Sequence, residues 1–495
     1  MEEQPAGTPA TPTSLARRTI NSLTWNSIAN LLTLPVSFLQ SVLLARLLPV
    51  ADFGVYGGMA ALTTLCYAFF EFGLGAAALH RAPETEHEEQ TMAILFTLRL
   101  ILLSIGAALL VCIALVFFTD QRRQMLVVLA VSGWALRLAM AGHVLLIRRV
   151  QHRRLALMDI LQTGVVFVVA VWIAASSGSI WALAVAPVVQ TVIYTILLYV
   201  WMPVWRPRLA WDSSAVRYFL TFGGRVVTGT TLGAALDHVD DLWTNFYLGD
   251  LAMGYYSRAY RFAVYPRVLL AEPVNTVSLG MYAELKHDRQ RRSRAFFQVN
   301  ALLVRTGFLL AGWLALIAPQ FIRIFLGERW LPMLAAFQLM LVYTLFDPLK
   351  MTIANLFFAV GQPEVVSKAR LVQLVALAAG LFLLGSRFGI AGVALSVDFM
   401  LVIGIGLLLV RARSHVDISL LRLFAAPAVA LVLGFFTTAA IGRVMLPGAG
   451  DWLSLVVKSL VYVLLYGSLL FLLERRQLLD ATREVLATGK FVERV

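Results

Sequence analysis

The chain has 495 residues, of which 60% are hydrophobic and only 14% are charged, and its formal net charge is +13. This composition, with a mean hydropathy of +0.79, excludes a soluble globular protein and predicts a polytopic membrane protein. The basic residues lie in short clusters between apolar runs, a pattern that orients membrane helices, so no nucleic-acid partner is expected.

Residues 1–16 are rich in Pro, Thr and Ala and contain no apolar signal-peptide core, so we expect a disordered cytoplasmic tail. The two cysteines, Cys66 and Cys112, lie inside apolar runs without the spacing of a metal site or a redox pair. No nucleotide-binding or hydrolytic motif is present. We therefore expect no metal and no cofactor, apart from H⁺ or Na⁺ as a coupling ion, and a transporter rather than an enzyme.

A membrane-crossing helix needs ~20 mostly apolar residues, and the chain contains about fourteen such segments. They cover residues 18–46, 51–79, 91–119, 123–147, 155–177, 180–203, 216–247, 251–284, 295–322, 331–360, 366–386, 389–410, 419–442 and 452–474. Lys and Arg are concentrated in alternate loops, beginning with the N-terminal one, so both termini are expected in the cytoplasm. The predicted fold class is an all-α integral membrane protein.

An internal repeat aligns LPVADFGVY (residues 48–56) with LGDLAMGYY (residues 248–256), so that Leu, Gly and Tyr recur 200 positions apart. An even number of spans separates the copies, which predicts a parallel repeat with a pseudo-two-fold axis along the membrane normal. The expected architecture is two six-helix lobes followed by two extra helices. Its segments are a tail (1–16), an N-terminal lobe (17–205), a C-terminal lobe (206–414), the extra helices (415–474) and a cytoplasmic tail (475–495).

Charged residues interrupt the apolar spans most densely around LDHVDDLW, residues 236–243. Asp237, Asp240 and Asp241 share one helical face, because residues three or four apart are neighbours on a helix. The next span carries Arg258, Arg261 and Arg267 with tyrosines between them. Equal distance from the turn between the two spans, about 12 Å of helical rise, predicts that Asp241 pairs with Arg258. The same count places Asp237 near Arg261.

Other charges lie singly in the spans, and each is expected to face a cavity or to have a partner, because an ionisable group at mid-bilayer costs ~2.5–3.5 kcal/mol. For Arg99, Arg137, Arg305 and Asp398 we favour structural ion pairs. Pro348 is expected to kink its span and to present Asp347 and Lys350 on either side. An excess of arginine in a cavity suits a phosphate group, whereas the carboxylates or His238 could bind a coupling cation; the sequence leaves open which one does.

Several stretches resemble the Wzx-type lipid-linked oligosaccharide flippases, the polysaccharide exporters of the multidrug/oligosaccharidyl-lipid/polysaccharide (MOP) superfamily. They are LLARLLPVADFGVYGGMAAL with FEFGLGAAALHR, VDDLWTNFYLGDLAMGYYSRAYR, GERWLPM and FFAVGQPEVVSKARLVQLV. The resemblance implies two lobes around a central cavity and alternating access. Its implied activity is to carry an undecaprenyl-pyrophosphate-linked oligosaccharide from the cytoplasmic to the external leaflet of the plasma membrane. A cation gradient or the membrane potential would drive this movement.

The resemblance also implies roles for the intramembrane charges. The pyrophosphate would be bound by Arg258, Arg261, Arg267, Arg225 and Lys350, and the cavity or coupling carboxylates would be Asp237, Asp240, Asp241, Glu71, Glu272 and Asp347. Expected partners are the lipid-linked oligosaccharide, membrane lipid and other proteins of polysaccharide assembly. Alternative interpretations are a small-molecule or drug exporter of the same superfamily, a peptidoglycan-precursor flippase, and a membrane polysaccharide polymerase or ligase.

Overall fold

The computed structural model describes residues 12–80, 88–149, 151–201, 203 and 205–488; regular structure in these ranges is helical throughout, with no strand. The side chains of residues 12–24, 26, 27, 269–273, 276 and 476–488 lie outside the description. The chain forms two compact units, of which unit 1 is Met1–Leu48 with Leu62–Thr231 and unit 2 is Pro49–Ala61 with Leu232–Val495. Helices α2 and α9 each contribute residues to both units.

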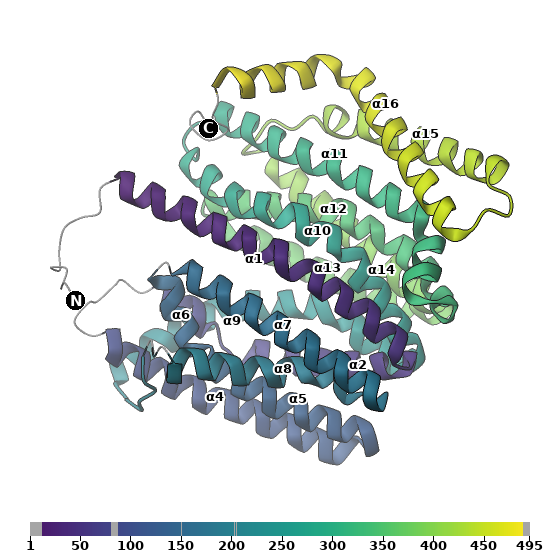
Figure 1. Cartoon of the computed structure of the whole chain (residues 1–495). Helices are drawn as coiled ribbons and strands as arrows, with labels where there is room; N and C mark the ends of the chain where they lie inside the picture. Colours follow the sequence, from purple (N-terminus) through teal and green to yellow (C-terminus); the bar gives the residue numbers. More distant parts are fainter. Residues whose placement is uncertain (1–11, 81–87, 150, 202, 204, 489–495) are drawn as a thin grey trace. The chain divides into compact units, whose positions relative to one another are not determined.

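Unit 1 is a bundle of long helices with two short ones, in which α1 packs on α7, α4 on α5, and α8 on both α5 and α7 (Figure 1). Its elements are α1 Pro12–Leu47, α2 Val50–Phe70, α3 Leu74–His80, α4 Glu88–Phe117, α5 Asp120–Ala139, α6 Ala141–Arg148, α7 His152–Ser177, α8 Trp181–Thr195, the π-helical η1 Ile196–Trp201 and α9 Ser213–Trp243. The predicted span 51–79 is interrupted between α2 and α3, because Phe72 and Gly73 both have positive φ.

Unit 2 is organised around α12, which packs against α10, α11 and α14, while α15 and α16 pair with each other and contact α11. Its elements after α9 are η2 Thr244–Leu248, α10 Asp250–Glu284, α11 Arg289–Phe321, η3 Ile322–Leu326, η4 Glu328–Met333, α12 Leu334–Ala359, α13 Pro363–Gly380, η5 Leu381–Gly385, α14 Ser386–Ala412, α15 Leu420–Met445 and α16 Asp451–Thr488.

Eleven stretches of described helix are long and apolar enough to cross a membrane, which confirms the predicted all-α membrane fold. One of them, Pro363–Ala412, contains both α13 and α14 and therefore two of the predicted spans. Helices α9 and α10 have sufficient length but carry more polar residues, and they are not among the eleven. The predicted number of fourteen is accordingly approximate.

The predicted tail of residues 1–16 overlaps the first helix. Residues 1–11 lie outside the described part of the chain, and α1 begins already at Pro12, within the predicted tail 1–16. At the other end α16 continues to Thr488, with a break in helical geometry at Glu474. The division into lobes at residues 205 and 414 stays a prediction.

Apolar side chains lie on the outside of the described bundle and several polar ones lie inside, as expected for a protein surrounded by lipid. Large apolar side chains such as Phe117, Val116 and Val444 are about three-quarters exposed, whereas Arg99, Asp347 and Asn300 are buried. Lipid accepts apolar side chains without cost but cannot solvate an ion, so polar groups are satisfied inside the helix bundle. Charged side chains inside the described bundle are therefore the places to look for function.

The two copies of the sequence repeat meet each other within unit 2. A methyl group added at Gly54 would lie 1.8 Å from the carbonyl oxygen of Asp250, and one added at Gly254 would lie 2.1 Å from the carbonyl oxygen of Val50. Val50 and Asp250 are themselves 200 positions apart, as Gly54 and Gly254 are. The contact is therefore reciprocal, and each glycine permits the backbone of the other copy to approach. We call these four residues the glycine crossing.

The segment between α14 and α15 contains a histidine with an environment that disfavours protonation. The His415 ring Nε2 lies 3.1 Å from Gln362 Oε1, and the His415 carbonyl accepts a hydrogen bond of 2.8 Å from Arg292 Nη2. Burial, reinforced by the positive charges of Arg292 and Arg289, lowers the pKa of His415 below its usual range.

We expect this histidine to make the protein less stable in acid. Because the folded state binds the proton more weakly than the unfolded state does, the full contribution is present above pH ~6.5 and is lost as pH falls through the lowered pKa. Thermal unfolding at pH 7.5 and pH 5.5 should therefore show a smaller acid-induced loss for His415→Gln than for the native chain. If His415→Gln loses as much stability in acid as the native chain does, His415 is not the group responsible.

Candidate functional site

The most tightly connected group of charges lies between α10 and α12 in unit 2. Arg267 Nη1 is 2.5 Å from Asp347 Oδ2, and Lys350 Nζ is 2.6 Å from Asp347 Oδ1. The Tyr343 hydroxyl lies 3.4 Å from Arg267 Nη1, and the Tyr343 ring centroid lies 5.6 Å from Lys350 Nζ. We call these four residues the Asp347 cluster.

The sequence builds this cluster through helical spacing on α12. Tyr343 precedes Asp347 by four residues and Lys350 follows it by three, so all three project from one face. The prediction that Pro348 would present Asp347 and Lys350 on either side is wrong, because α12 continues through Pro348 and the two side chains form an ion pair. The tyrosine was missed, although its spacing from Asp347 is visible in the sequence.

The Asp347 carboxylate is almost completely buried, whereas Arg267 and Lys350 keep 25% and 20% of their side-chain surface exposed. Each of its oxygens has a cationic partner, which is what a buried charge requires. Arg267, Lys350 and Asp347 together carry a net charge of one positive unit, and the two cationic side chains are partly exposed. Asp237 is exposed nearby and interacts electrostatically with both Lys350 and Asp347.

A second group, the Asp240 cluster, consists of His238, Asp240, Asp241 and Tyr256. The Tyr256 hydroxyl donates a hydrogen bond to Asp240 Oδ2, and His238 Nδ1 lies 3.3 Å from Asp241 Oδ2. The predicted pairing of Asp241 with Arg258 is therefore wrong. The nearest partner of Asp241 is His238, one turn away on the same helix, where geometry favours contact. The neighbouring helix α10 supplies the Tyr256 phenol to Asp240.

Arg258 and Arg261 occupy different environments on α10. Arg258 is buried with its guanidinium carbon 4.5 Å from the ring centroid of Phe53, and Phe53 makes an edge contact with Trp330. Arg261 is exposed, and among the described residues it has no salt bridge, so the expected proximity to Asp237 gives no ion pair. Of the three predicted arginines on α10, only Arg267 joins a carboxylate in the described ion pairs.

Of the remaining predicted residues, two lie in unit 1 and one has a side chain that the structure does not describe. Glu71 lies in unit 1, where its Oε1 is 3.0 Å from Arg137 Nε. Arg225 is exposed on the unit 1 part of α9. Glu272 lies outside the residues whose side chains the structure describes. The structure thus brings together Arg267, Lys350 and Asp347 with Asp237 close by, and every assigned role stays a prediction.

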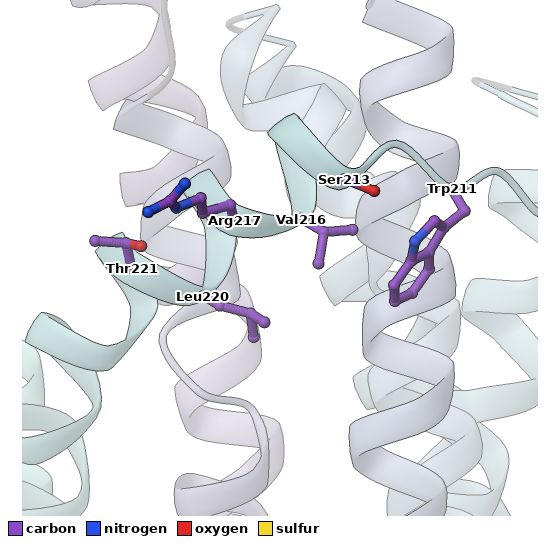
Figure 2. Close-up of a pocket in the computed structure, with 6 residues that line it drawn as sticks. All are labelled: Trp211, Ser213, Val216, Arg217, Leu220 and Thr221. Atoms are coloured by element: carbon purple, nitrogen blue, oxygen red, sulfur yellow. The ribbon is translucent and has the colours of Figure 1, made fainter.

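An open hollow of 410 Å³ lies at the start of α9 in unit 1. Figure 2 shows the side chains that line it on the chain entering α9 and on its first turns: Trp211, Ser213, Val216, Arg217, Leu220 and Thr221. An exposed tryptophan beside an arginine is typical of the membrane–water interface. None of the predicted site residues lines this hollow, so we interpret it as a lipid-facing surface.

The fold is that of a known class of membrane transporters. A structure of the lipid II flippase MurJ in an inward closed conformation matches with a TM-score of 0.76 at 13% identity, over 91% of this chain and 99% of that one. An inward-facing multidrug resistance MATE transporter of the MOP superfamily matches with a TM-score of 0.61 at 14% identity, over 78% of this chain and 97% of that one. At such identities these likenesses establish the fold alone.

The family follows from the sequence. The polysaccharide biosynthesis protein family matches residues 43–335, and the chain belongs to this family. It is 22% identical to the lipopolysaccharide biosynthesis protein WzxC of Escherichia coli (strain K12), over 79% of each chain. It is 26% identical to the succinoglycan biosynthesis transport protein ExoT of Rhizobium meliloti (strain 1021), over 65% of each. The predicted resemblance to Wzx-type exporters of the MOP superfamily is confirmed.

Proposed function

We propose that this protein is a flippase that moves an undecaprenyl-pyrophosphate-linked oligosaccharide from the cytoplasmic to the external leaflet of the plasma membrane. Membership of the polysaccharide biosynthesis protein family, the transport name of ExoT and the likeness to transporter folds support this proposal. Both termini would lie in the cytoplasm, as the charge distribution of the loops predicts. Transport would proceed by alternating access of two lobes.

The observation that carries the proposal is the Asp347 cluster. A guanidinium and an ammonium group converge on one carboxylate, and both are also donors that bind phosphate oxygens well. In this structure Asp347 occupies the position of the anion. A pyrophosphate would take over the accessible donors of Arg267 and Lys350, and its negative charge would be balanced by the same two cations. This electrostatic preference favours an anionic lipid head group over a cationic drug.

The energy source would act at the neighbouring carboxylates. Asp240 and Asp241 are adjacent in sequence, and their partners, Tyr256 and His238, can each share a proton with a carboxylate. Two carboxylates at one place repel each other when both are ionised, so the site gains from binding H⁺ or Na⁺. We assign the coupling ion to the Asp240 cluster, and a gradient of that ion or the membrane potential would drive turnover.

Neutralising the cations of the Asp347 cluster should stop export. We expect Arg267→Gln and Lys350→Gln each to lower export of the glycan by about tenfold to a hundredfold, because each removes a charge-assisted hydrogen bond to the phosphate. Surface polysaccharide would be measured in a strain lacking its own flippase, with protein level in the membrane as the reference.

The matched control for this experiment is Arg323→Gln, which removes an arginine from a half-exposed ion pair with Asp451. We expect it to export normally, because exposed ion pairs contribute little. Normal export by both Arg267→Gln and Lys350→Gln at native membrane levels would refute the pyrophosphate role of the Asp347 cluster.

A further inference from the structure

Unit 1 contains a second group of charges that the proposed function does not use. Arg137 from α5 forms an ion pair with Glu71, Nε to Oε1 3.0 Å, and its guanidinium carbon lies 4.5 Å from the ring centroid of Tyr67. Arg99 from α4 interacts electrostatically with both Glu71 and Arg137. The sequence interpretation treated Arg99 and Arg137 as structural ion pairs, and this holds for Arg137 alone.

Arg99 is the unusual member of the group. Its side chain is 8% exposed, and its Nε and Nη1 atoms are buried without a hydrogen-bond partner. No salt bridge to Arg99 occurs among the described residues, whereas Arg137 beside it has a carboxylate at 3.0 Å. A buried guanidinium without a partner is strongly unfavourable, and such a group calls for a ligand, an ion or ordered water. Each of these two N–H groups can donate a hydrogen bond to an oxygen of an anion.

The surrounding backbone keeps space for this guanidinium. A methyl group added at Gly75 would come within 3.3 Å of Arg99 Nη2, so a larger side chain at position 75 would crowd that nitrogen. Glu71 follows α2 in a turn in which Phe72 has a φ of 50°, a conformation that is rare for residues other than glycine. Gly223 of α9 permits this turn, since a methyl group there would lie 2.3 Å from the Phe72 carbonyl oxygen.

The charges indicate what kind of ligand fits. Arg137 is already balanced by Glu71, whereas Arg99 is not, so Arg99, Arg137 and Glu71 together leave one positive charge. A ligand with a single negative charge would balance it, while a pyrophosphate would bring excess charge close to the Glu71 carboxylate. Access is open on the Glu71 side, because the side chains of Glu71 and Arg137 are 42% and 23% exposed.

We propose that Arg99, with Arg137 and Glu71, forms an anion site in unit 1 that binds a carboxylate group, and that this carboxylate belongs to an acidic sugar of the transported glycan. The second half of this proposal rests on the proposed flippase function, whereas the first half does not. Glu71 pairs with Arg137, and the sugar carboxylate would accept hydrogen bonds from Arg99. An acidic sugar is thus recognised in unit 1 and the pyrophosphate in unit 2.

The test measures binding by the full-length protein purified in detergent. The probes are D-glucuronate, D-glucose, acetate and inorganic pyrophosphate at constant ionic strength, and the signal is the shift of the thermal unfolding midpoint as each probe is titrated. We expect glucuronate to raise the midpoint saturably, glucose to have no effect, and acetate to bind at least tenfold more weakly than glucuronate. Acetate with equal affinity would overturn the assignment to a sugar and leave a site for free small acids.

Variants identify the residues responsible. Arg99→Gln and Gly75→Val should each raise the Kd for glucuronate at least tenfold, the first by removing the cation and the second by covering it, while Arg323→Gln should bind as the native chain does. Gly75→Val keeps the arginine, so it tests the site even where Arg99→Gln does not fold. Unchanged glucuronate binding in Arg99→Gln or Gly75→Val, or no binding to the native chain, would overturn the proposal.

The same titrations separate this site from the Asp347 cluster. Arg267→Gln should weaken pyrophosphate binding and leave glucuronate binding unchanged, and Arg99→Gln should do the reverse. Loss of pyrophosphate binding in Arg99→Gln would overturn the single-charge assignment of the unit 1 site. Native export by both Arg267→Gln and Lys350→Gln would instead refute the proposed role of the Asp347 cluster, and the glucuronate-binding result would still stand.

Discussion

Asp347→Asn is expected to destabilise the protein by about 3 kcal/mol or more, although the two side chains have the same shape. The native carboxylate accepts Arg267 at 2.5 Å and Lys350 at 2.6 Å in a buried position. A neutral amide cannot balance two cations, and removing one partner of a buried ion pair costs ~3–5 kcal/mol. The free energy of unfolding would be obtained from thermal or denaturant unfolding in detergent.

The control for this prediction is Asp451→Asn, which breaks the half-exposed pair with Arg323 at 3.4 Å. We expect a change of about 0–1 kcal/mol, because water screens such a pair. Adding pyrophosphate to Asp347→Asn should recover part of the lost stability, since the added anion replaces the missing charge. Equal destabilisation by Asp347→Asn and Asp451→Asn would mean that the Asp347 carboxylate is not needed to balance the charges of Arg267 and Lys350.

Gly54→Ala is expected to destabilise the protein and to impair export, even though alanine is the better helix former. The added methyl group would lie 1.8 Å from the Asp250 carbonyl oxygen, and backbone at that position cannot rotate away as a side chain could. Overpacking of this kind costs ~1–3 kcal/mol. Gly280→Ala is the matched control, because nothing lies within 4 Å of the added atom, and there alanine should gain up to ~1 kcal/mol.

A double substitution tests whether the two halves of the glycine crossing are one contact. Once Gly54→Ala has forced the helices apart, Gly254→Ala meets a contact that is already loosened, so its additional cost should be smaller than its cost alone. The free energies of unfolding of the two single variants and the double variant would be compared. Strict additivity would show that the two glycines act independently.

The sequence was sufficient for the fold and for the location of the charges, because both depend on local features. Apolar run length predicts membrane helices, and eleven stretches of described helix have the required length and composition. The orientation inferred from the loop charges and the lobes inferred from the repeat stay predictions. The proximity of Tyr343, Asp347 and Lys350 is predictable for the same reason, since helical spacing places them on one face of α12.

Partners across helices were harder to predict, because they depend on rotation of each helix about its axis. Counting residues from the turn placed Asp241 and Arg258 at equal depth, but depth does not fix which side of a helix a residue occupies. Asp241 consequently contacts His238, and Arg258 lies over Phe53. The sequence also could not predict that Glu71 pairs with Arg137 and not with Arg99, because this depends on the direction of the Glu71 side chain at the turn formed by Phe72.

The glycine crossing has a consequence for the origin of the chain. Position 50 faces position 254, and position 250 faces position 54, which is the geometry of an isologous interface between two identical subunits. A gene duplication followed by fusion would convert a homodimer contact of this kind into the present intramolecular one. In such a homodimer every substitution altered the interface twice, whereas after fusion each copy was free to change alone. Phe53 and Met253 occupy equivalent positions and differ, whereas Gly54 and Gly254 are the same residue and each lies against the backbone of the other copy.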